Sequence, residues 1–589
     1  KGYRASQNAL MLARKIKDRP LQIQALIYSI IPLTFLGELS RANRLRHQAE
    51  GMLQKTNYPE LEALFLKMWS ELVLFGGRLD LELAARLVEQ LQERIEQLGL
   101  LYVHAPALYS EFAYHMYAGD AERAKQIGNR LLEFSDATDN SYGRGFCSIL
   151  LGLLAYRQRQ WSRARDLFET GLEIFRQPAT LSSLHDHQFS IGAGLVHMHL
   201  TNWQQAEGLL KRSLQHFTNI SSQLARTEAL LSLALLYEQK GHWKLALDYL
   251  ESGLSIALSR QFTHFVILSP TDQVSLCLLA LEAGSKEARD YAAHLLHTGL
   301  SETVAAEESW LMKHSHKQVR KTIYEVVRSR HRSNRPRVYI QSLGRFRVWV
   351  GGKLLSDSDW EGNQAQNLLK ALVALASEKP VRKEFVIDQL WPESSPGADE
   401  KTFKVALHRL RRTLEPDMDA RFGSSYILLQ HGALSLDSEL CRTDIQDFLL
   451  LCKETRNHLQ SGETPKALQA LQEADSLYQG DFLPDEPEKD WAREVRERLR
   501  QTCIEAQFEV ARAYESLGSW TKAIRHYQRA LDCDPLLEEA YRRIMRLYAD
   551  RGKRAKALQV FETCRTALRN ALDVDPEELT MSLYRKIKG

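Results

Sequence analysis

Residues 401–412 read Lys401-Thr402-Phe403-Lys404-Val405-Ala406-Leu407-His408-Arg409-Leu410-Arg411-Arg412, with five Lys or Arg and no acidic residue. A helix turns 100° per residue, so this stretch would gather apolar and cationic residues on opposite stripes. The apolar stripe comprises Phe403, Leu407, Leu410 and Leu414, and the opposite stripe comprises Lys401, Val405, His408 and Arg412, with Lys404 beside them. The pattern predicts one face for a core and one for an anionic partner.

A DNA major groove admits a helix of this kind. Its phosphates attract the cations, and base edges are read by Lys, Thr, His and Arg side chains. Taken alone, the helix is more typical of a solvated basic surface. The residues around it decide between the two interpretations.

The residues before the basic helix predict a small sheet and two further helices. Residues 338–343 and 346–350 are rich in β-branched and aromatic residues, and Gly351-Gly352 is a hairpin signal before residues 353–355. Residues 367–376 and 382–390 have the apolar periodicity of helices.

A hairpin is predicted after the basic helix, because residues 426–430 and 433–436 flank the tight-turn pair His431-Gly432. Sheet, three helices and hairpin is the order of a winged helix, whose last helix enters the major groove while the hairpin, or wing, lies on the DNA backbone. We expect base-edge contacts from Lys401, Thr402, Lys404, Val405, His408 and Arg412, and phosphate contacts from Arg409, Arg411, Gln430 and His431.

Two series of motifs carry a family resemblance. The first is Leu368-Leu369-Lys370-Ala371-Leu372, Leu390-Trp391-Pro392, Leu407-His408-Arg409-Leu410-Arg411-Arg412 and Leu434-Ser435-Leu436-Asp437. The second is Asp444, Phe448, Gly480-Asp481-Phe482-Leu483-Pro484, Trp491 and Asp573-Val574-Asp575-Pro576. They resemble the winged helix of SARP-type bacterial transcriptional activators and the bacterial transcriptional activator domain that accompanies it. The resemblance implies binding to double-stranded promoter DNA, as a side-by-side homodimer on direct repeats, and contact with RNA polymerase.

The region before the winged helix contains an internal repeat. Its signature is an alanine five residues after each turn, spaced by 42, 40, 40, 42 and 40 residues: Ala42, Ala84, Ala124, Ala164, Ala206 and Ala246. Each unit is predicted to be a helical hairpin that stacks on its neighbours into a solenoid. Trp161, Trp203 and Trp243 recur at one repeat position, two residues into the second helix, and are expected to pack between repeats.

A second repeat, with a period of 34 residues, lies near the end of the chain. Its positions match the tetratricopeptide pattern: Ala511, Tyr514, Gly518, Ala523 and Tyr527, then Tyr548, Gly552, Ala557 and Phe561. The N-terminal units, stretched to about 40 residues, resemble the tetratricopeptide repeats of MalT-like signal-responsive regulators, although HEAT-type helical pairs share that period. The MalT-like resemblance implies a small-molecule or protein inducer in the repeat groove.

The densest aromatic stretch of the solenoid lies between residues 102 and 117. Its candidate ligand-binding residues, for a flat or sugar-like ligand, are Tyr102, His104, Tyr109, Tyr114 and Tyr117. Packing in the repeat core is the more frequent role of such residues.

Composition favours an intracellular protein and local contacts with nucleic acid. Lys and Arg outnumber Asp and Glu by only 78 to 74, so the whole chain is not a polycation. Seven cysteines without a Cys-x-x-Cys pair suit a reducing cytoplasm. The most apolar early run, residues 26–36, is too short to span a membrane.

The sequence gives an enzyme little support. It contains no Gly-x-x-x-x-Gly-Lys-[Ser/Thr], Gly-x-Ser-x-Gly or His-Glu-x-x-His motif. Four histidines form two pairs, His185 with His187 and His197 with His199. On a helix, residues two apart point about 200° from each other, so neither pair would converge on one metal ion. We expect no catalytic residues, metal or cofactor in this chain. Because it starts within repeats at Lys1, we expect it to be the C-terminal part of a longer chain, and the MalT-like resemblance implies an NTPase module upstream.

The expected protein is mostly α, with a tetratricopeptide-like solenoid sensor (residues 1–326), a basic linker (327–337), a small α/β winged helix (338–440) and a C-terminal tetratricopeptide-like activator domain (441–589). The five arginines between residues 328 and 337 are expected to form a solvated tether or to add nonspecific phosphate attraction. The predicted function is signal-responsive transcription activation. The main alternative is an interaction scaffold whose winged helix does not bind DNA.

Overall fold

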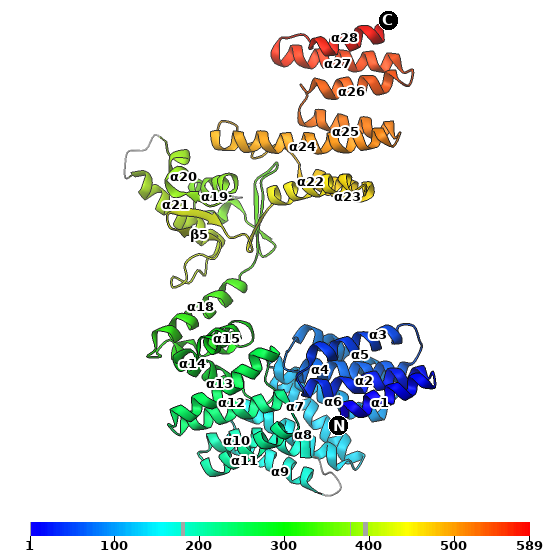
Figure 1. Cartoon of the computed structure of the whole chain (residues 1–589). Coiled ribbons are helices and arrows are strands. Elements are labelled where there is room, and N and C mark those ends of the chain that lie inside the picture. Colours follow the sequence, from blue (N-terminus) through cyan, green and yellow to red (C-terminus); the bar gives the residue numbers. More distant parts are fainter. Residues whose placement is uncertain (1, 178–182, 377–378, 393–397) are drawn as a thin grey trace. The chain divides into compact units, whose positions relative to one another are not determined.

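The computed structural model describes residues 2–177, 183–376, 379–392 and 398–589, and the side chains of residues 101, 102, 183 and 398 lie outside this description. The chain forms two compact units, Lys1–His331 (unit 1) and Arg332–Gly589 (unit 2). Each is described by itself below (Figure 1). The division falls inside the predicted linker segment, residues 327–337.

Unit 1 consists of helices, most of them in antiparallel pairs joined by short turns. They are α1 (Gly2–Lys15), α2 (Arg19–Phe35), α3 (Leu39–Leu53), α4 (Pro59–Phe75), α5 (Leu81–Leu98), α6 (Leu101–Tyr117), α7 (Ala121–Ala137), α8 (Ser141–Arg157), α9 (Trp161–Arg176), α10 (Ser183–His199), α11 (Trp203–Asn219), α12 (Gln223–Gln239), α13 (Trp243–Arg260), α14 (Pro270–Ala283), α15 (Lys286–Thr298), α16 (Ser301–Ala306), α17 (Glu308–Leu311) and α18 (Lys317–Ser333), whose last two residues belong to unit 2.

The repeated alanines explain how these pairs stack. All six occupy the fourth position of the second helix of a pair and have no exposed surface: Ala42, Ala84, Ala124, Ala164, Ala206 and Ala246. A small side chain there lets two helix backbones approach closely, and interiors packed at crystal density have no room for a larger one. The predicted repeat is therefore confirmed. The three repeated tryptophans begin their helices, at the first rather than the third position, and Trp243 is half exposed.

Unit 2 begins with two small sheets around a group of helices. These elements are β1 (Val338–Gln341), β2 (Arg347–Val350), β3 (Lys353–Leu354), the short 3-10 helix η1 (Asp357–Asp359), α19 (Asn363–Leu375), β4 (Val381–Arg382), α20 (Lys383–Leu390), α21 (Ala398–Leu414), β5 (Ile427–Gln430), β6 (Ala433–Leu436) and β7 (Cys441–Thr443). The strand orders are β3-β2-β1-β7 and β4-β6-β5, and every pairing is antiparallel except that of β1 with β7.

The rest of unit 2 is helical, with α22 (Asp444–Gln460), α23 (Thr464–Leu477), α24 (Asp490–Ser516), α25 (Trp520–Cys533), α26 (Glu538–Ala549), α27 (Arg554–Leu572) and α28 (Glu578–Lys588). The tetratricopeptide positions Ala523, Tyr527, Ala557 and Phe561 are buried, as the second repeat predicts. The fold class predicted from the sequence is confirmed. None of the described helices is long and apolar enough to cross a membrane.

The sheet containing β1 joins the winged helix to the helices that follow it. The buried carboxylate of Asp444, the first residue of α22, accepts hydrogen bonds from Ser342 N at 2.6 Å, Ser342 Oγ at 2.8 Å and Leu343 N at 2.7 Å. In turn, Leu483 N donates to the Ser342 carbonyl at 3.0 Å. One hydrophobic cluster extends from Val338 to Leu547, so the predicted border at residues 440 and 441 runs through a continuous core.

Candidate nucleic-acid interface

The apolar stripe of α21 is buried as predicted. Phe403, Leu407, Leu410 and Leu414 have exposed fractions of 5% or less and belong to the hydrophobic cluster of unit 2. The helix packs against α19, which is itself apolar along one side. This packing fixes which face of α21 is turned outward.

The opposite stripe is exposed. Lys401, Lys404, Val405, His408, Arg409 and Arg412 are all exposed, and Thr402 is half-buried beside them. We call these seven residues the outer face of α21. Val405 is 41% exposed, although contact with water does not stabilise an apolar side chain. The described residues of unit 2 therefore leave a cationic face with one apolar contact in its middle.

Two carboxylates lie close to the outer face. Glu400 is 3.3 Å from both Lys404 Nζ and Lys383 Nζ, and the hydrogen bonds from Lys383 and Lys404 lower the pKa of Glu400. Glu361 lies 3.8 Å from Arg412 Nε. The pairs of Lys404 and Arg412 are exposed and that of Lys383 is partly buried, and exposed pairs contribute little to stability. Lys401, His408 and Arg409 make no ion pair with any described residue.

Arg411 has a different partner from the one expected. Its side chain is partly buried and donates from Nη2 to the Ile427 carbonyl oxygen at 3.0 Å, and burial lowers its pKa. The residue therefore ties α21 to strand β5 of the wing. Its predicted phosphate contact stays a prediction, and the observed contact supports the wing.

The wing has the predicted turn. His431 and Gly432 adopt positive φ of 51° and 79°, as a tight hairpin of strands β5 and β6 requires. Gln430 and His431 are exposed at its tip. Lys383, the first residue of α20, donates from its backbone N to the Gly432 carbonyl at 2.9 Å, and β4 pairs with β6. These contacts hold the turn of the wing in place.

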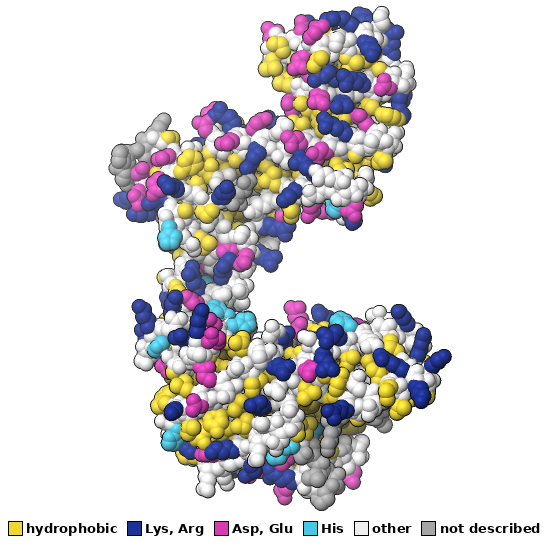
Figure 2. All heavy atoms as spheres, viewed as in Figure 1, with side chains coloured by type: hydrophobic (Ala, Val, Ile, Leu, Met, Phe, Trp, Pro, Cys, Tyr) yellow, Lys and Arg dark blue, Asp and Glu magenta, His cyan; other side chains and the backbone are white. Residues whose placement is uncertain are grey.

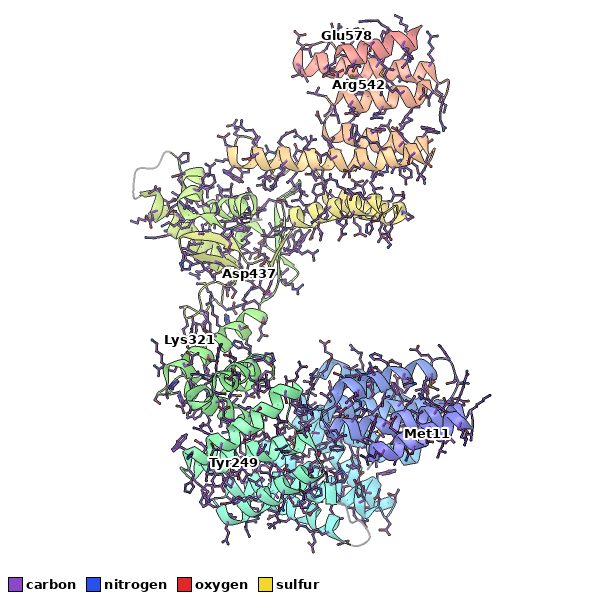
Figure 3. All side chains as sticks on the ribbon, in the orientation of Figure 1. Met11, Tyr249, Lys321, Asp437, Arg542 and Glu578 are labelled. Atoms are coloured by element: carbon purple, nitrogen blue, oxygen red, sulfur yellow. The ribbon has the colours of Figure 1, made fainter. Side chains whose placement is uncertain are left out.

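The predicted arginine tether is ordered structure instead. Helix α18 continues to Ser333. Arg332 Nη2 then lies 2.6 Å from Asp437 and 2.8 Å from Glu439, in the segment between β6 and β7 where Figure 3 labels Asp437. Arg335 has its side chain buried against Glu415, with Nε and the carboxylate oxygen 3.0 Å apart. Arg335 is thus buried and Arg332 is paired at the surface of unit 2, whereas Arg328 and Arg337 are exposed, so the run is ordered and only partly solvated.

Charge elsewhere is mixed. On the face shown in Figure 2, Lys and Arg side chains alternate with Asp and Glu over both units, in agreement with the near balance of 78 against 74. The outer face of α21 is therefore a local feature, as the composition requires of any nucleic-acid contact.

The candidate ligand residues of unit 1 divide into two groups. Tyr109 and Tyr117 line a cavity of about 390 Å³, where Tyr109 stacks on Phe146 at 4.6 Å and the buried Tyr117 hydroxyl has no hydrogen-bond partner among the described residues. His104 packs on Phe134 at 4.9 Å and Tyr114 joins a core cluster, and neither lines that cavity. The side chain of Tyr102 lies outside the described residues.

The same cavity contains a buried acid that the sequence did not single out. Glu228 is 1% exposed and accepts a hydrogen bond from Ile267 N at 2.8 Å, and burial raises its pKa to about 7. Glu228 lies in a long apolar run of α12 that resembles ordinary repeat core, so no pattern marks it.

The four histidines of α10 have separate partners. His185 contacts the Tyr142 hydroxyl at 3.1 Å, His187 stacks on His216, His197 lies 3.5 Å from Glu169, and His199 lies 3.2 Å from Asp272. Among the described residues, no three His, Cys, Asp or Glu side chains are grouped as metal ligands.

Comparison with known proteins agrees with this architecture. The family model of the bacterial transcriptional activator domain matches residues 443–588, and that of the tetratricopeptide repeat matches residues 189–259. The regulatory protein AfsR of Streptomyces griseus is 24% identical over 42% of this chain, which spans only about a quarter (24%) of AfsR.

Two mycobacterial proteins are also similar. The transcriptional regulatory protein MoaR1 of Mycobacterium tuberculosis is 22% identical over 38% of this chain and 72% of its own length. The structure of Mycobacterium tuberculosis EmbR in complex with a low-affinity phosphopeptide aligns with 43% of this chain and 65% of its own, at 18% identity and a TM-score of 0.36. The resemblance to SARP-type activators with a tetratricopeptide-repeat region is confirmed.

Proposed function

We propose that this protein is a transcription regulator that binds promoter DNA by placing α21 in the major groove and the β5–β6 wing on the backbone. The observation that most supports this proposal is that the outer face of α21 is exposed beside the wing, while the apolar stripe of the same helix is buried. The match of residues 443–588 to an activator domain, and relatives that are named regulatory proteins, support the same class of function.

Each part of the interface has a proposed role. Hydrogen-bond donors for base edges come from Lys401, Lys404, His408 and Arg412. Thr402 lies at the edge of the outer face, and the exposed Val405 would contact the methyl group of thymine. Arg409, Gln430 and His431 lie where phosphate oxygens would pass. In this proposal the activator domain contacts RNA polymerase, two copies bind direct repeats, and a signal received by the solenoid alters binding. The cavity lined by Tyr109 and Tyr117 is the proposed place for that inducer.

A salt titration tests DNA binding. The full chain is titrated with labelled duplexes, selected from genomic fragments that it retains, at several salt concentrations. Phosphate-driven binding predicts that the logarithm of affinity falls linearly with the logarithm of salt concentration, by roughly 0.9 for each phosphate neutralised. Salt-independent association, or no retained fragments, would instead favour an interaction scaffold.

Glu400→Gln is expected to tighten DNA binding by about threefold at low salt, because it removes a negative charge beside the outer face and releases Lys404 and Lys383 from their carboxylate partner. The measurement is the dissociation constant for the selected duplex. Glu497→Gln is the matched control, since Glu497 is an exposed partner of Arg500 in α24 and the change in net charge is the same. Equal gains in both variants would assign the effect to net charge rather than to the position of Glu400.

A further inference from the structure

Unit 1 contains a second cavity, of about 860 Å³, that belongs to neither the predicted groove residues nor the DNA interface. It lies where α8 turns into α9 and α12 into α13, and it is lined also by residues of α14 and α17. Its volume is that of a site for a small organic molecule.

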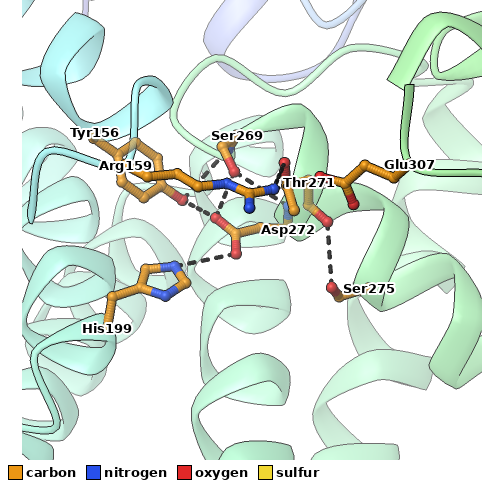
Figure 4. Close-up of polar contacts among 8 residues, drawn as sticks. All are labelled: Tyr156, Arg159, His199, Ser269, Thr271, Asp272, Ser275 and Glu307. Carbon is orange, nitrogen blue, oxygen red and sulfur yellow. Dashed lines mark hydrogen bonds and ion pairs between the residues drawn. The ribbon is translucent and has the colours of Figure 1, made fainter. Parts of the chain in front are cut away.

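One wall of this cavity is a fully engaged polar network (Figure 4). Asp272, in the first turn of α14, accepts hydrogen bonds from the Tyr156 hydroxyl and from Ser269 Oγ, the latter at 2.7 Å, and lies 3.2 Å from His199 Nε2. The ring of His199 stacks on Trp161 at 4.2 Å with an interplanar angle of 9°. These contacts hold the wall in place and leave it little spare hydrogen-bonding capacity.

Two other lining residues are unusual in their exposure. Trp243 is 51% exposed and Trp310 is 58% exposed, and both line this cavity. Tryptophan is highly buried on average, and exposed indole rings that share one hollow are typical of binding sites. The indole face carries negative charge density, so its preferred polar partner is a cation.

The charged residues that line the cavity also favour a cation, because acidic groups outnumber guanidinium groups. Its lining includes four carboxylates and two guanidinium groups. Glu307 pairs with Arg159, Asp272 with His199, and Glu282 lies 3.5 Å from His314. Arg157 is engaged elsewhere, 5.0 Å over the Tyr117 ring and 3.5 Å from the Val266 carbonyl.

The fourth carboxylate, Glu238, has no side-chain hydrogen bond or ion pair with the described residues. It is half-buried, and burial together with the nearby Glu282 raises its pKa. A half-buried acid without a partner is costly, and a bound positive charge would remove that cost.

We propose that this cavity binds a small organic cation, with an ammonium or guanidinium head over the indole rings of Trp243 and Trp310 and balanced by Glu238 and Glu282. An anionic ligand would face an excess of carboxylates, and a neutral ligand would leave Glu238 without a partner. The site does not depend on DNA binding by α21.

The test uses the full chain, with tryptophan fluorescence and calorimetry as readouts. The probes are choline, the neutral analogue of choline in which carbon replaces the quaternary nitrogen, and N-acetylarginine amide. We expect choline or the arginine derivative to bind about tenfold more tightly than the neutral analogue. Tighter choline binding assigns an alkylammonium ligand, and tighter binding of the arginine derivative assigns a guanidinium ligand.

Two variants locate the site. Glu238→Gln and Trp310→Leu are each expected to weaken binding of the preferred cation by at least about threefold. Trp310 is 58% exposed and Glu238 makes no side-chain hydrogen bond or ion pair with the described residues, so neither substitution is expected to lower the midpoint of thermal unfolding. Trp203→Leu is the control, because Trp203 occupies the same repeat position as Trp243 without lining this cavity. The proposal is overturned if neither cation binds, if the neutral analogue binds equally well, or if both variants bind as the unchanged chain does.

Discussion

Replacing Lys401 and Arg412 together by alanine is expected to lower affinity for the selected duplex about a hundredfold at physiological salt. Each side chain lies at one end of the outer face of α21, and removing one well-placed contact to a base or phosphate costs on the order of 1–3 kcal/mol. The two positions are three helical turns apart, so their effects should add. Fluorescence anisotropy with labelled duplex measures the loss.

The salt dependence separates the two kinds of contact. If both residues neutralise phosphates, the slope of log affinity against log salt becomes shallower by up to about two, whereas pure base contacts leave the slope unchanged and relax sequence preference. The matched control is Lys522→Ala with Arg525→Ala, which removes the same charge from exposed positions of α25. An unchanged affinity and slope in the α21 variant would show that this face does not contact DNA.

Features with a local signature could be predicted from the sequence. The buried stripe of α21 follows from 3.6-residue periodicity, and the wing follows from His431-Gly432, where the backbone needs positive φ. The solenoid follows from the spacing of alanines such as Ala206 and Ala246, because close helix contact admits only a small side chain. These signals lie within one element or recur from one repeat to the next.

Features that depend on distant partners could not be predicted. Strands β4 and β7 span only two and three residues, too few for an alternating pattern, and each exists because a partner strand supplies hydrogen bonds. The partner of Arg411 is 16 residues away and that of Arg332 more than 100. A run of arginines looks the same in sequence whether its side chains are solvated or paired. The candidate ligand residues of α6 likewise divide by which way each side chain faces, and only Tyr109 and Tyr117 of those described face the cavity.

Arg335→Ala is expected to destabilise unit 2 by about 3 kcal/mol, the low end of the cost of breaking a buried ion pair by removing one partner. The Arg335 side chain is 8% exposed and that of Glu415 is fully buried. Arg335 also pairs with Asp417 at 2.7 Å and donates to its carbonyl oxygen at 3.2 Å. Without the guanidinium, the Glu415 charge would keep, among the residues that the structure describes, only its two hydrogen bonds from Ser425, at 2.9 Å each.

Calorimetry of the full chain measures this loss as a fall in the unfolding midpoint of unit 2 by roughly 6–12 °C, with the transition of unit 1 unchanged. Arg337→Ala is the matched control, because Arg337 is exposed two residues further on and a surface substitution usually costs less than about 0.5 kcal/mol. The two interpretations of the arginine run make opposite predictions. If the run is a solvated tether, both variants should be equally stable and should bind DNA equally weakly. If Arg335 and Glu415 form a buried pair, only Arg335→Ala should lower the stability of unit 2. A midpoint in Arg335→Ala equal to that of the control would contradict the buried pair.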